Sequence, residues 1–449
     1  MKKTTLKFVA LAAGAAASAL GGLNAHAQSA DALLDKLVDK GIITVKEAEE
    51  LRQQSDKDFA RAYSAKSGMP EWVTAFKING DFRGRYESFG SQNDLFTDRH
   101  RFRYRLRLGA VATIKDNLEV GLRLTSGEAN GTFGGDPISG NTTMQDNGSK
   151  KFVFIDLAYG KWSFVNTKAV TETITIGKME NPFVLSDAVF DADYTPEGAA
   201  YNLTYRPNDI HAFKFNGGGF ILDEISTDSN DPYMFGAQIR WDAIWSKAFA
   251  SSMGVAGLNI AHDQTLVNGA VPNVQRGNTR NAAGAPATHF NPIIGDASVT
   301  YTFVDGIPFY QAAFPIKLAG EYMNNPAADE REQAWQGGVT FGKAGKKGLW
   351  EISYRYKYLG GDAWYEELVD SDFGAYYQDE WPNSGQTTAA AARYGAGTNV
   401  RGHVAKINYS LFDALTLGVT YFRTELIDES PAGSNSDMTR LQVDAVWKF

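Results

Sequence analysis

Five arginines alternate with bulky residues in the stretch RHRFRYRLRLGA, residues 99–110. Guanidinium groups bind phosphate and carboxylate groups through paired hydrogen bonds, so a row of them predicts an anion-attracting surface. A nucleic-acid patch, a surface strand and a membrane strand would each use that surface differently. The chain as a whole has a formal net charge of −8, which argues against a general nucleic-acid binder. The role of the row therefore depends on the element that carries it.

Cysteine chemistry is excluded because none of the 449 residues is a cysteine. The histidines after residue 27 are scattered and have no partnering serine motif, although His100 and His403 could face an interior. Those histidines are His100, His211, His262, His289 and His403. The acids of 228–231, and those of 362–372, are weak calcium candidates because their spacing matches no defined loop. We expect no enzymatic activity, no cofactor and no bound metal.

Residues 1–27 have the pattern of a secretory signal peptide. A basic start precedes an apolar run from Phe8 to Leu23, and Ala25-His26-Ala27 predicts cleavage after Ala27. A retained membrane helix is the weaker alternative, because the run is short and rich in Ala and Gly. For residues 28–72 we expect a periplasmic helical segment and linker, with a capping box at 44–47. This segment could dock or self-associate, or it could be a solvated spacer.

From residue 74 onward the apolar pattern has a period of two, which is typical of β-strands. The pattern slips near Ala405 and Lys406, where we expect a β-bulge. We count sixteen candidate strands, at 74–88, 100–114, 117–126, 152–163, 172–179, 199–206, 210–221, 233–245, 252–261, 297–304, 314–323, 333–342, 349–358, 399–410, 415–424 and 439–449.

The connections between these strands alternate in length. Short joints lie at 115–117, 206–209, 343–347 and 412–414, and long joints lie at 127–151, 180–198, 262–296 and 359–398. A soluble sandwich has no reason for this alternation, whereas an outer-membrane barrel has short periplasmic turns and long extracellular loops. We therefore predict that 73–449 is an all-β domain, a 16-stranded antiparallel transmembrane β-barrel with both chain ends on the periplasmic side.

The last strand carries a second signal of this class. In TRLQVDAVWKF the apolar residues share one face, and Trp447 and the terminal Phe449 belong to it. This resembles the C-terminal signal that bacterial outer-membrane proteins present to the barrel assembly machinery. The resemblance predicts that Trp447 and Phe449 act as an assembly signal.

In a barrel of this kind the arginines must face the lumen. An arginine facing lipid at the bilayer midplane costs roughly 2–4 kcal/mol, so a row of them on that face would prevent insertion. Phe102, Tyr104, Leu106 and Leu108 would then face lipid. Arginines on a polar strand face could instead serve only as solubilising or pairing residues. The expected pore-lining set is Arg83, Arg85, Arg101, Arg103, Arg105, Arg107 and Arg123.

The long joint 180–198 is acidic and would be the third extracellular loop. The expected constriction-loop residues are Asp187, Asp191, Asp193 and Glu197. In the general porins, which this arrangement resembles, the third loop folds into the barrel and faces a basic cluster. The resemblance implies an arginine-lined constriction opposite an acidic loop. Alternatively, this loop is simply solvated, or it binds divalent cations that bridge lipopolysaccharide.

The mature chain resembles bacterial outer-membrane porins, and most of all the "putative porin" group and its phosphate-selective relatives. Residues 33–52, the strand 99–110 and the terminal VDAVWKF carry this resemblance. It implies a Gram-negative outer-membrane location, contact with lipid and lipopolysaccharide, a homotrimer, and a water-filled channel for passive diffusion of small hydrophilic solutes and ions. Phosphate selectivity is not implied, because those pores use lysine-rich walls and this one is arginine-rich.

Two other functions are compatible with the sequence. Loops 262–296 and 359–398 are long enough for a surface-interaction protein, such as an adhesin or receptor. An outer-membrane hydrolase is the remaining alternative, although no nucleophile or acid–base set supports it. Tyr376, Tyr377 and Trp381 could form a sugar-stacking track or could pack within their loop. The preferred solute is not indicated.

Overall fold

The computed structural model describes residues 68–92, 98–129, 134–266, 277–281, 285–374, 397–428 and 436–449. The expected signal peptide lies outside these residues, as does the expected helical segment 28–72 apart from a turn at its end. The chain divides into two compact units, 1–74 and 75–449. The second unit forms a β-barrel.

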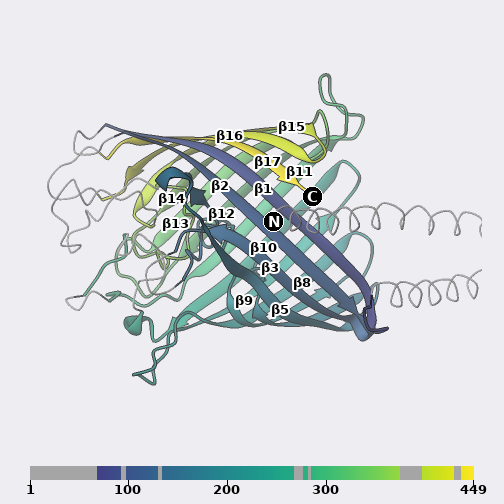
Figure 1. Ribbon diagram of the computed structural model, residues 1–449, viewed down its shortest axis with the longest axis horizontal. Helices are drawn as coiled ribbons and strands as arrows, with labels where there is room; N and C mark the ends of the chain where they lie inside the picture. The colour runs from purple at the N-terminus through teal and green to yellow at the C-terminus, as the bar shows by residue number, and fades with distance from the viewer. Residues whose placement is uncertain are drawn as a thin grey trace, which may run out of the picture. The chain divides into compact units, whose positions relative to one another are not determined.

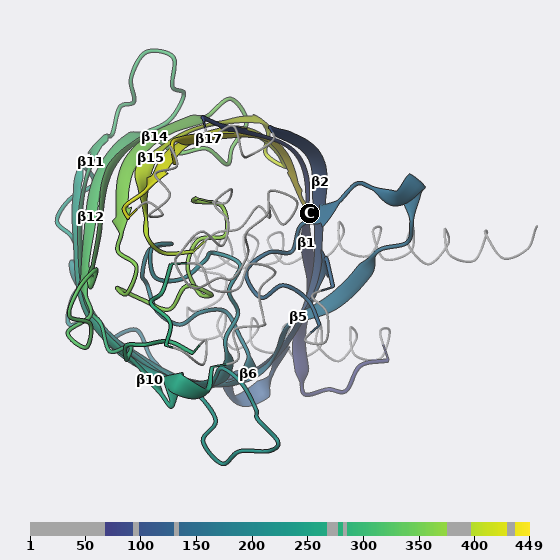
Figure 2. The same cartoon turned by 90° about the vertical axis from the view of Figure 1, so that its left-hand side faces the viewer.

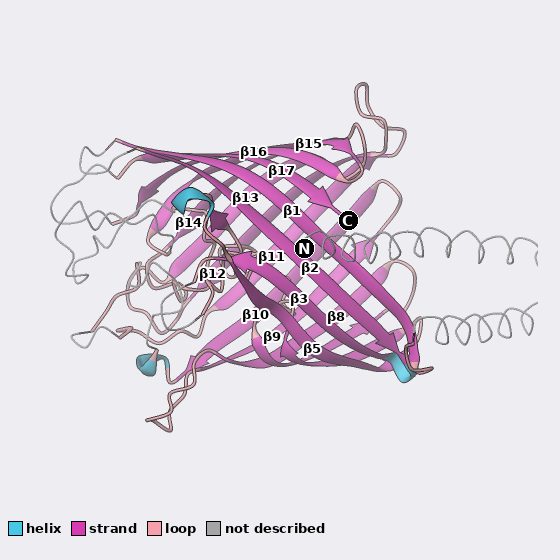
Figure 3. Ribbon diagram, in the orientation of Figure 1, coloured by secondary structure: helices cyan, strands magenta, loops and turns pink. Residues whose placement is uncertain are grey.

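The barrel is a single closed antiparallel sheet of 17 strands (Figures 1 and 3). One of these strands, β4, has only two residues, so 17 − 1 = 16 strands make the wall, as the sequence predicts. Pairing of β1 with β17 closes the ring. The strands are β1 Val73–Ser91, β2 Arg99–Ile114, β3 Leu118–Gly127, β4 Thr142–Thr143, β5 Phe152–Asn166, β6 Val170–Lys178, β7 Glu197–Tyr205, β8 His211–Ile221, β9 Tyr233–Ile244, β10 Phe249–Ala261, β11 Ile293–Phe303, β12 Phe314–Asn324, β13 Gln333–Gly342, β14 Trp350–Leu359, β15 Val400–Phe412, β16 Leu415–Leu426 and β17 Met438–Lys448.

The bulge expected near Ala405 and Lys406 is wrong in position. The register of β15 against both neighbours runs evenly through these two residues, and it shifts between Ser410 and Phe412 instead. The slip in the apolar pattern has another cause, because Ala405 stands opposite Tyr354 and Lys406 opposite Ser353 in a regular ladder. A small residue on the outward face is therefore what blurred the pattern.

Alternation along each strand sorts side chains to the two faces of the wall. On β2, Phe102 is 58% exposed and Leu106 is 45% exposed, whereas Arg103 is 8% exposed and Arg105 is 7% exposed. The inward direction of the arginines thus follows from the strand period. None of the helices among the described residues is long and apolar enough to cross a membrane.

Connections at the two ends of the barrel differ in length, as predicted. We call one end the short-turn end; there η1 Lys115–Asn117 joins β2 to β3, and 413–414 joins β15 to β16. At the opposite, long-loop end, 128–151, 179–196, 262–292 and 360–399 connect successive strands. The remaining three-residue helices, η2 Asp146–Gly148 and η3 Asp263–Thr265, lie in the first and third of these connections.

The connection 179–196 and the segment 360–374 fill part of the lumen, and loops lie inside the ring of strands in Figure 2. Val189 and Phe190 of the connection 179–196 are buried together with Trp364 and Leu368 of the connection 360–399. The rings of Phe190 and Trp364 meet edge to face, with centroids 6.1 Å apart. The apolar core of this barrel therefore sits within the lumen, where these loops pack against inward-facing residues of the strands such as Phe220 and Met234.

The C-terminal residue completes the seam between β1 and β17. The backbone N–H of Phe449 donates to the Gly80 carbonyl at 3.1 Å, and the Gly80 N–H donates to the Phe449 carbonyl at 2.9 Å. A Cβ at position 80 would lie 2.4 Å from the Arg107 carbonyl and 2.5 Å from the Phe449 ring. Glycine is thus required here by the close approach of β2 and Phe449.

Candidate functional site

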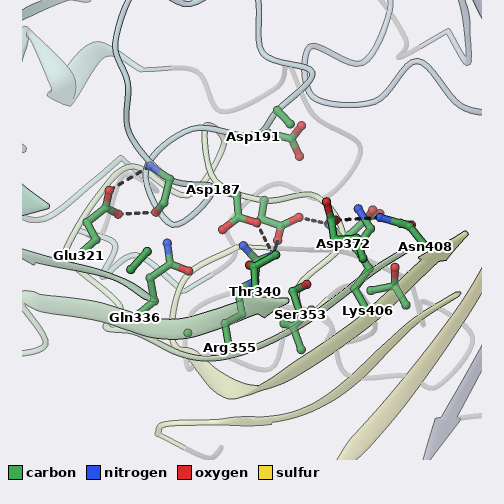
Figure 4. A pocket seen from close by; sticks show the side chains of 18 of the residues that line it. Asp187, Asp191, Glu321, Gln336, Thr340, Ser353, Arg355, Asp372, Lys406 and Asn408 are labelled. Atoms are coloured by element: carbon green, nitrogen blue, oxygen red, sulfur yellow. Dashed lines mark hydrogen bonds and ion pairs between the residues drawn. The ribbon is translucent and has the colours of Figure 1, made fainter. Parts of the chain in front are cut away.

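The lumen toward the short-turn end contains a charged cavity of about 950 Å³. Its wall is formed mainly by β8–β17 with β1 and β2, and the infolded connections contribute Asp187, Asp191 and Asp372 (Figure 4). Its basic lining residues are Arg83, Arg85, Arg105, Arg107, Lys214, Arg240, Lys317, Arg355 and Lys406. Its acidic lining residues are Asp187, Asp191, Asp193, Asp242, Asp296, Glu321, Glu351, Asp370, Asp372 and Asp444.

Arg105 and Arg107 of β2 form one of the contacts between the wall and the connection 179–196. Nη1 of Arg105 lies 2.8 Å and 3.0 Å from the two carboxylate oxygens of Asp193, and Nη1 of Arg107 lies 3.3 Å from Oδ1. Asp81 of β1 bridges the same two arginines at 2.9 Å and 2.7 Å. Two guanidinium groups thus share two carboxylates. Only one of those carboxylates belongs to the wall.

Arg85 of β1 belongs to a second, more deeply buried cluster. It pairs with Asp444 of β17 at 2.7 Å and with Asp372 of the connection 360–399 at 3.1 Å. Arg440 of β17 contacts Asp372 at 2.8 Å and the fully buried Glu87 at 2.6 Å. Burial opposes ionisation of Asp372, but Arg440 and Arg85 together hold its pKa well below the ordinary value. This cluster fixes Asp372 to the wall as an anion.

The other predicted pore-lining arginines have varied partners. Arg83 lines the cavity and donates to the Asn141 side chain at 2.6 Å. Arg101 pairs with Glu87, and Arg103 donates to the Asn141 carbonyl at 3.2 Å. Arg123 pairs with Asp156 and Glu180. Arg101, Arg103 and Arg123 line neither this cavity nor a smaller one beside it.

The connection 179–196 crosses the lumen and contacts several strands in turn. The Val184 carbonyl accepts from Arg240 of β9 at 3.0 Å, and the Ser186 N–H donates to Glu321 of β12 at 3.0 Å. Asp187 then pairs with Arg355 and Lys357 of β14, at 2.5 Å and 2.8 Å. Figure 4 shows Asp187 of this loop together with Glu321 and Arg355 of the wall. The loop therefore spans from β9 to β14 before it reaches β2.

Two of the predicted constriction-loop acids make contacts that differ from the expectation. Asp187 faces Lys357 and Arg355, so cations also line β14, which β15, β16, β17 and β1 separate from β2. Burial opposes its ionisation, but Lys357 and Arg355 lower its pKa below the ordinary value. Glu197 is the first residue of β7 and pairs with Lys178 at 3.1 Å. Of the four predicted acids, Asp193 is the one that contacts the β2 arginines.

Asp191 joins the two infolded connections instead of facing an arginine. Its carboxylate accepts from the backbone N–H of Asp193 at 2.7 Å and from that of Ser371 at 2.6 Å. Burial raises its pKa well above the ordinary value, and the nearby carboxyls of Asp193 and Asp370 raise it further. The backbones also pair directly, through Asp191 with Leu368 and Asp370 with Asp187. Asp191 thus sets the position of Asp193.

The segment 360–374 is anchored by buried polar contacts with neighbouring connections. Glu366 pairs with Arg280, and both side chains are almost fully buried. Asp362 pairs with Arg331 at 2.8 Å and accepts from the Thr279 N–H at 2.7 Å. These contacts, together with the apolar core, make a packed cap over part of the lumen. Four of the acids considered for calcium, Asp362, Glu366, Asp370 and Asp372, are paired with basic side chains.

A smaller cavity of about 520 Å³ lies on the other side of the connection 179–196, toward the long-loop end of β3 and β5–β8. It is mostly acidic, and Arg105, Arg107 and Asp193 line it as well as the larger cavity. Its acidic residues are Asp136, Asp156, Asp193, Glu197, Asp223, Glu224 and Glu367, and its basic residues are Arg105, Arg107 and Lys178. The two cavities therefore meet at the contact of Asp193 with β2.

The histidines do not contribute to either cavity. His100 and His403 lie on the outward face, where they bond to Tyr86 at 2.9 Å and Tyr354 at 2.7 Å, so the suggestion that they face the lumen is wrong. No group of three His, Asp or Glu side chains suited to a metal ion occurs within the described ranges. Sequence reasoning missed Arg355 and Lys357, although their alternation with Tyr354 and Tyr356 carries the same signal as in β2.

Comparison with known proteins agrees with this architecture. Residues 92–262, which include β2 and the connection 179–196, match a family model described as "Putative porin". The Pseudomonas putida OprB structure determined at high pH aligns with 83% of this chain and 94% of its own, at 10% identity and a TM-score of 0.50. The chain resembles the bacterial porins. This is the resemblance that the sequence predicts.

Other porin structures are more distant from this porin-like barrel. OmpF of Salmonella typhi in complex with daunomycin shares 11% identity at a TM-score of 0.46, covering 83% of this chain and 97% of that chain. A mutant porin of Rhodopseudomonas blastica shares 10% identity at a TM-score of 0.39, over 84% of this chain and all of its own. Among the curated protein sequences, none matches this chain. At 10% identity the OprB structure establishes the fold alone.

Proposed function

We propose that this porin-like barrel is an outer-membrane porin through which small hydrophilic solutes and ions diffuse passively. The observation that carries the proposal is the charged lumenal cavity inside a closed wall whose outward face is apolar. A barrel of this strand number is wide enough for water-filled space even after loops have folded in. Solutes pass the arginines of β1 and β2 on one side and the acids of the infolded connections on the other.

The arrangement of charge supports passage of ions and polar solutes over passage of apolar ones. Arg83, Arg85, Arg105 and Arg107 line the cavity, and Asp187, Asp191 and Asp193 face it from the loop. Charges in a narrow water-filled passage act on ions more strongly than charges on an open surface. The constriction differs from a simple pair of opposed walls, since Asp193 contacts the arginines of β2 and Asp187 contacts Arg355 and Lys357 of β14. The ion selectivity of the channel then depends on the net charge that remains after these acids and bases have paired.

Planar-bilayer recording of the purified protein tests the proposal. We expect stepwise conductance increases in KCl as single channels insert. A folded protein that enters the bilayer without such steps would contradict a porin function. It would favour the surface-interaction or hydrolase alternative.

The arginine wall makes a separate prediction for charge selectivity. Replacing Arg103 and Arg105 with Ala removes two positive charges, one from the cavity lining and one from the buried network behind it. We expect the reversal potential in a KCl gradient to shift toward that of a more cation-selective channel. An unchanged reversal potential would show that these arginines serve only to pair with acids.

The membrane setting is part of the same proposal. The outward-facing Phe102, Leu106 and Leu108 would contact lipid, and the long connections would face the exterior and its lipopolysaccharide. Trp447 and Phe449 would present the assembly signal to the barrel assembly machinery. The porin resemblance further suggests a homotrimer. Light scattering of the detergent-solubilised protein tests this, and a monomeric mass would refute it.

A further inference from the structure

The contact of Asp193 with β2 is the junction between the two lumenal cavities. Arg105, Arg107 and Asp193 line both cavities. The Asp193 carboxylate spans from the connection 179–196 to the wall and receives two hydrogen bonds from Arg105 and one from Arg107. A solute that moves between the cavities along β2 must therefore pass this carboxylate.

The arginines at the junction have more capacity to bind anions than their partners use. Arg83, Arg105 and Arg107 carry three positive charges, and Asp81 and Asp193 supply two negative ones. Burial opposes ionisation of Asp193, but nearby arginines lower its pKa below the ordinary value. Arg105 has the largest lowering effect, and Arg83 is close enough to contribute as well. The Nε groups of Arg83 and Arg105 have no hydrogen-bond partner among the described residues. The other acids that act on Arg83 are Asp372 and Asp444, and both are paired with Arg85 or Arg440, so one positive charge is left over at the junction.

Asp193 is held in a way that permits exchange. Its side chain and that of Arg107 are each 21% exposed, whereas Asp81 and Arg105 are more buried. Asp81 is fixed on strand β1. Asp193 belongs to a loop, and its backbone N–H donates a hydrogen bond to the Asp191 carboxylate. A free carboxylate could therefore take the place of Asp193 without disturbing the wall.

We propose that Arg83, Arg105 and Arg107 form a binding subsite for small carboxylate solutes, and that Asp193 occupies it as a tethered counter-ion when no solute is bound. This inference rests on the proposed porin function and deepens it. The carboxylate is the favoured ligand class because the group that occupies the subsite is itself a carboxylate, bound by both oxygens. A passing carboxylate exchanges with Asp193 and so crosses the junction by replacing one anion with another.

The test compares two variants that each remove one acid from the smaller cavity. Asp193→Asn removes the tethered anion. Asp223→Asn removes the same charge from the same cavity, but Asp223 bonds to the Glu224 N–H and not to an arginine. Chloride current through single channels is measured in planar bilayers while acetate is added as the probe. The half-inhibiting acetate concentration reports occupancy of the subsite.

We expect Asp193→Asn to lower the half-inhibiting acetate concentration about tenfold, because a competing charge-assisted contact is lost. Chloride conductance should also rise. Asp223→Asn should leave the acetate concentration near the wild-type value, and adding Arg105→Ala to Asp193→Asn should abolish the gain. Equal acetate inhibition in Asp193→Asn, Asp223→Asn and wild type would overturn the inference.

Failure of the proposed porin function looks different, since the wild-type protein would then show no channel steps at all. Asp193→Ser removes the same carboxylate with a smaller side chain and provides a second variant if Asp193→Asn does not insert. It should show the same tenfold change. A wild-type response from Asp193→Ser would equally overturn the subsite.

Discussion

Lys357 is a buried cation that ties both infolded connections to β14, and its replacement by methionine should loosen them. Its side chain is fully buried, and its Nζ lies 2.8 Å from Asp187 and 3.0 Å from Asp370. The same Nζ lies 4.5 Å from the centre of the Phe373 ring. Asp187 belongs to the connection 179–196 and Asp370 to 360–374. One substitution therefore leaves a carboxylate on each connection without this partner.

The size of the effect follows from the burial of the three groups. Removing one partner of a fully buried ion pair costs about 3–5 kcal/mol. The Asp187 and Asp370 side chains keep 20% and 12% exposure, and Arg355 still contacts Asp187, so we take the low end, about 3 kcal/mol. That shifts the balance between docked and released loops by about 100-fold toward release.

Single-channel recording in planar bilayers measures this release. We expect Lys357→Met to raise the mean conductance and to add fluctuations between conductance levels. Lys406→Met is the matched control, because Lys406 lines the same cavity and has no acidic partner among the residues that the structure describes. A Lys357→Met channel as quiet and as narrow as the Lys406→Met channel would refute the anchoring role.

The pH dependence of the Lys357→Met channel gives an internal check. Burial raises the pKa of Asp370 above its ordinary value, although Lys357 acts to lower it, so without Lys357 the pKa rises further. At low pH the neutral Asp370 carboxyl no longer repels Asp187, and the loops should dock again. The excess conductance should thus shrink as the pH falls. Excess conductance that grows on acidification would contradict this explanation.

Three further predictions concern other parts of the barrel. Burial raises the pKa of Asp136 to about 7, so a rise in pH from 6 to 8 should add a negative charge to the smaller cavity and increase cation selectivity. Asp136→Asn should remove this pH dependence of the reversal potential. Glu366→Gln removes the buried negative charge that pairs with Arg280 and should cost about 3–5 kcal/mol of cap stability, seen as faster proteolysis of the long loops. Phe449→Ala should lower the yield of folded barrel in the outer membrane several-fold, whereas Phe449→Trp should not; equal yields would refute the assembly signal.

Strand positions and side-chain directions could be predicted because they depend on local periodicity. The alternation of Arg103 and Arg105 with Phe102 and Leu106 predicts the direction of the arginines, because a period of two places all the cations on one face of the strand. All sixteen wall strands, and the alternation of short turns and long loops, follow from the same kind of signal.

Contacts of the long connections could not be predicted in this way. Asp372 meets Arg85 across 287 residues of sequence, and no periodic pattern in a loop records such a partner. From the sequence, the acids of 362–372 are only weak calcium candidates. In the structure, long-range ion pairs and the apolar core around Trp364 hold these acids in the interior of the barrel. The third loop was predicted to fold inward from the porin resemblance, but its contact with Lys357 was not.

Liposome swelling tests the central claim, a water-filled passage for small hydrophilic solutes, most directly. The purified full chain is reconstituted into liposomes, which are diluted into isotonic solutions of uncharged sugars of increasing size. We predict swelling that is fastest for the smallest sugar and slows steadily with solute size. Liposomes that contain folded protein but do not swell even in the smallest sugar would contradict the account.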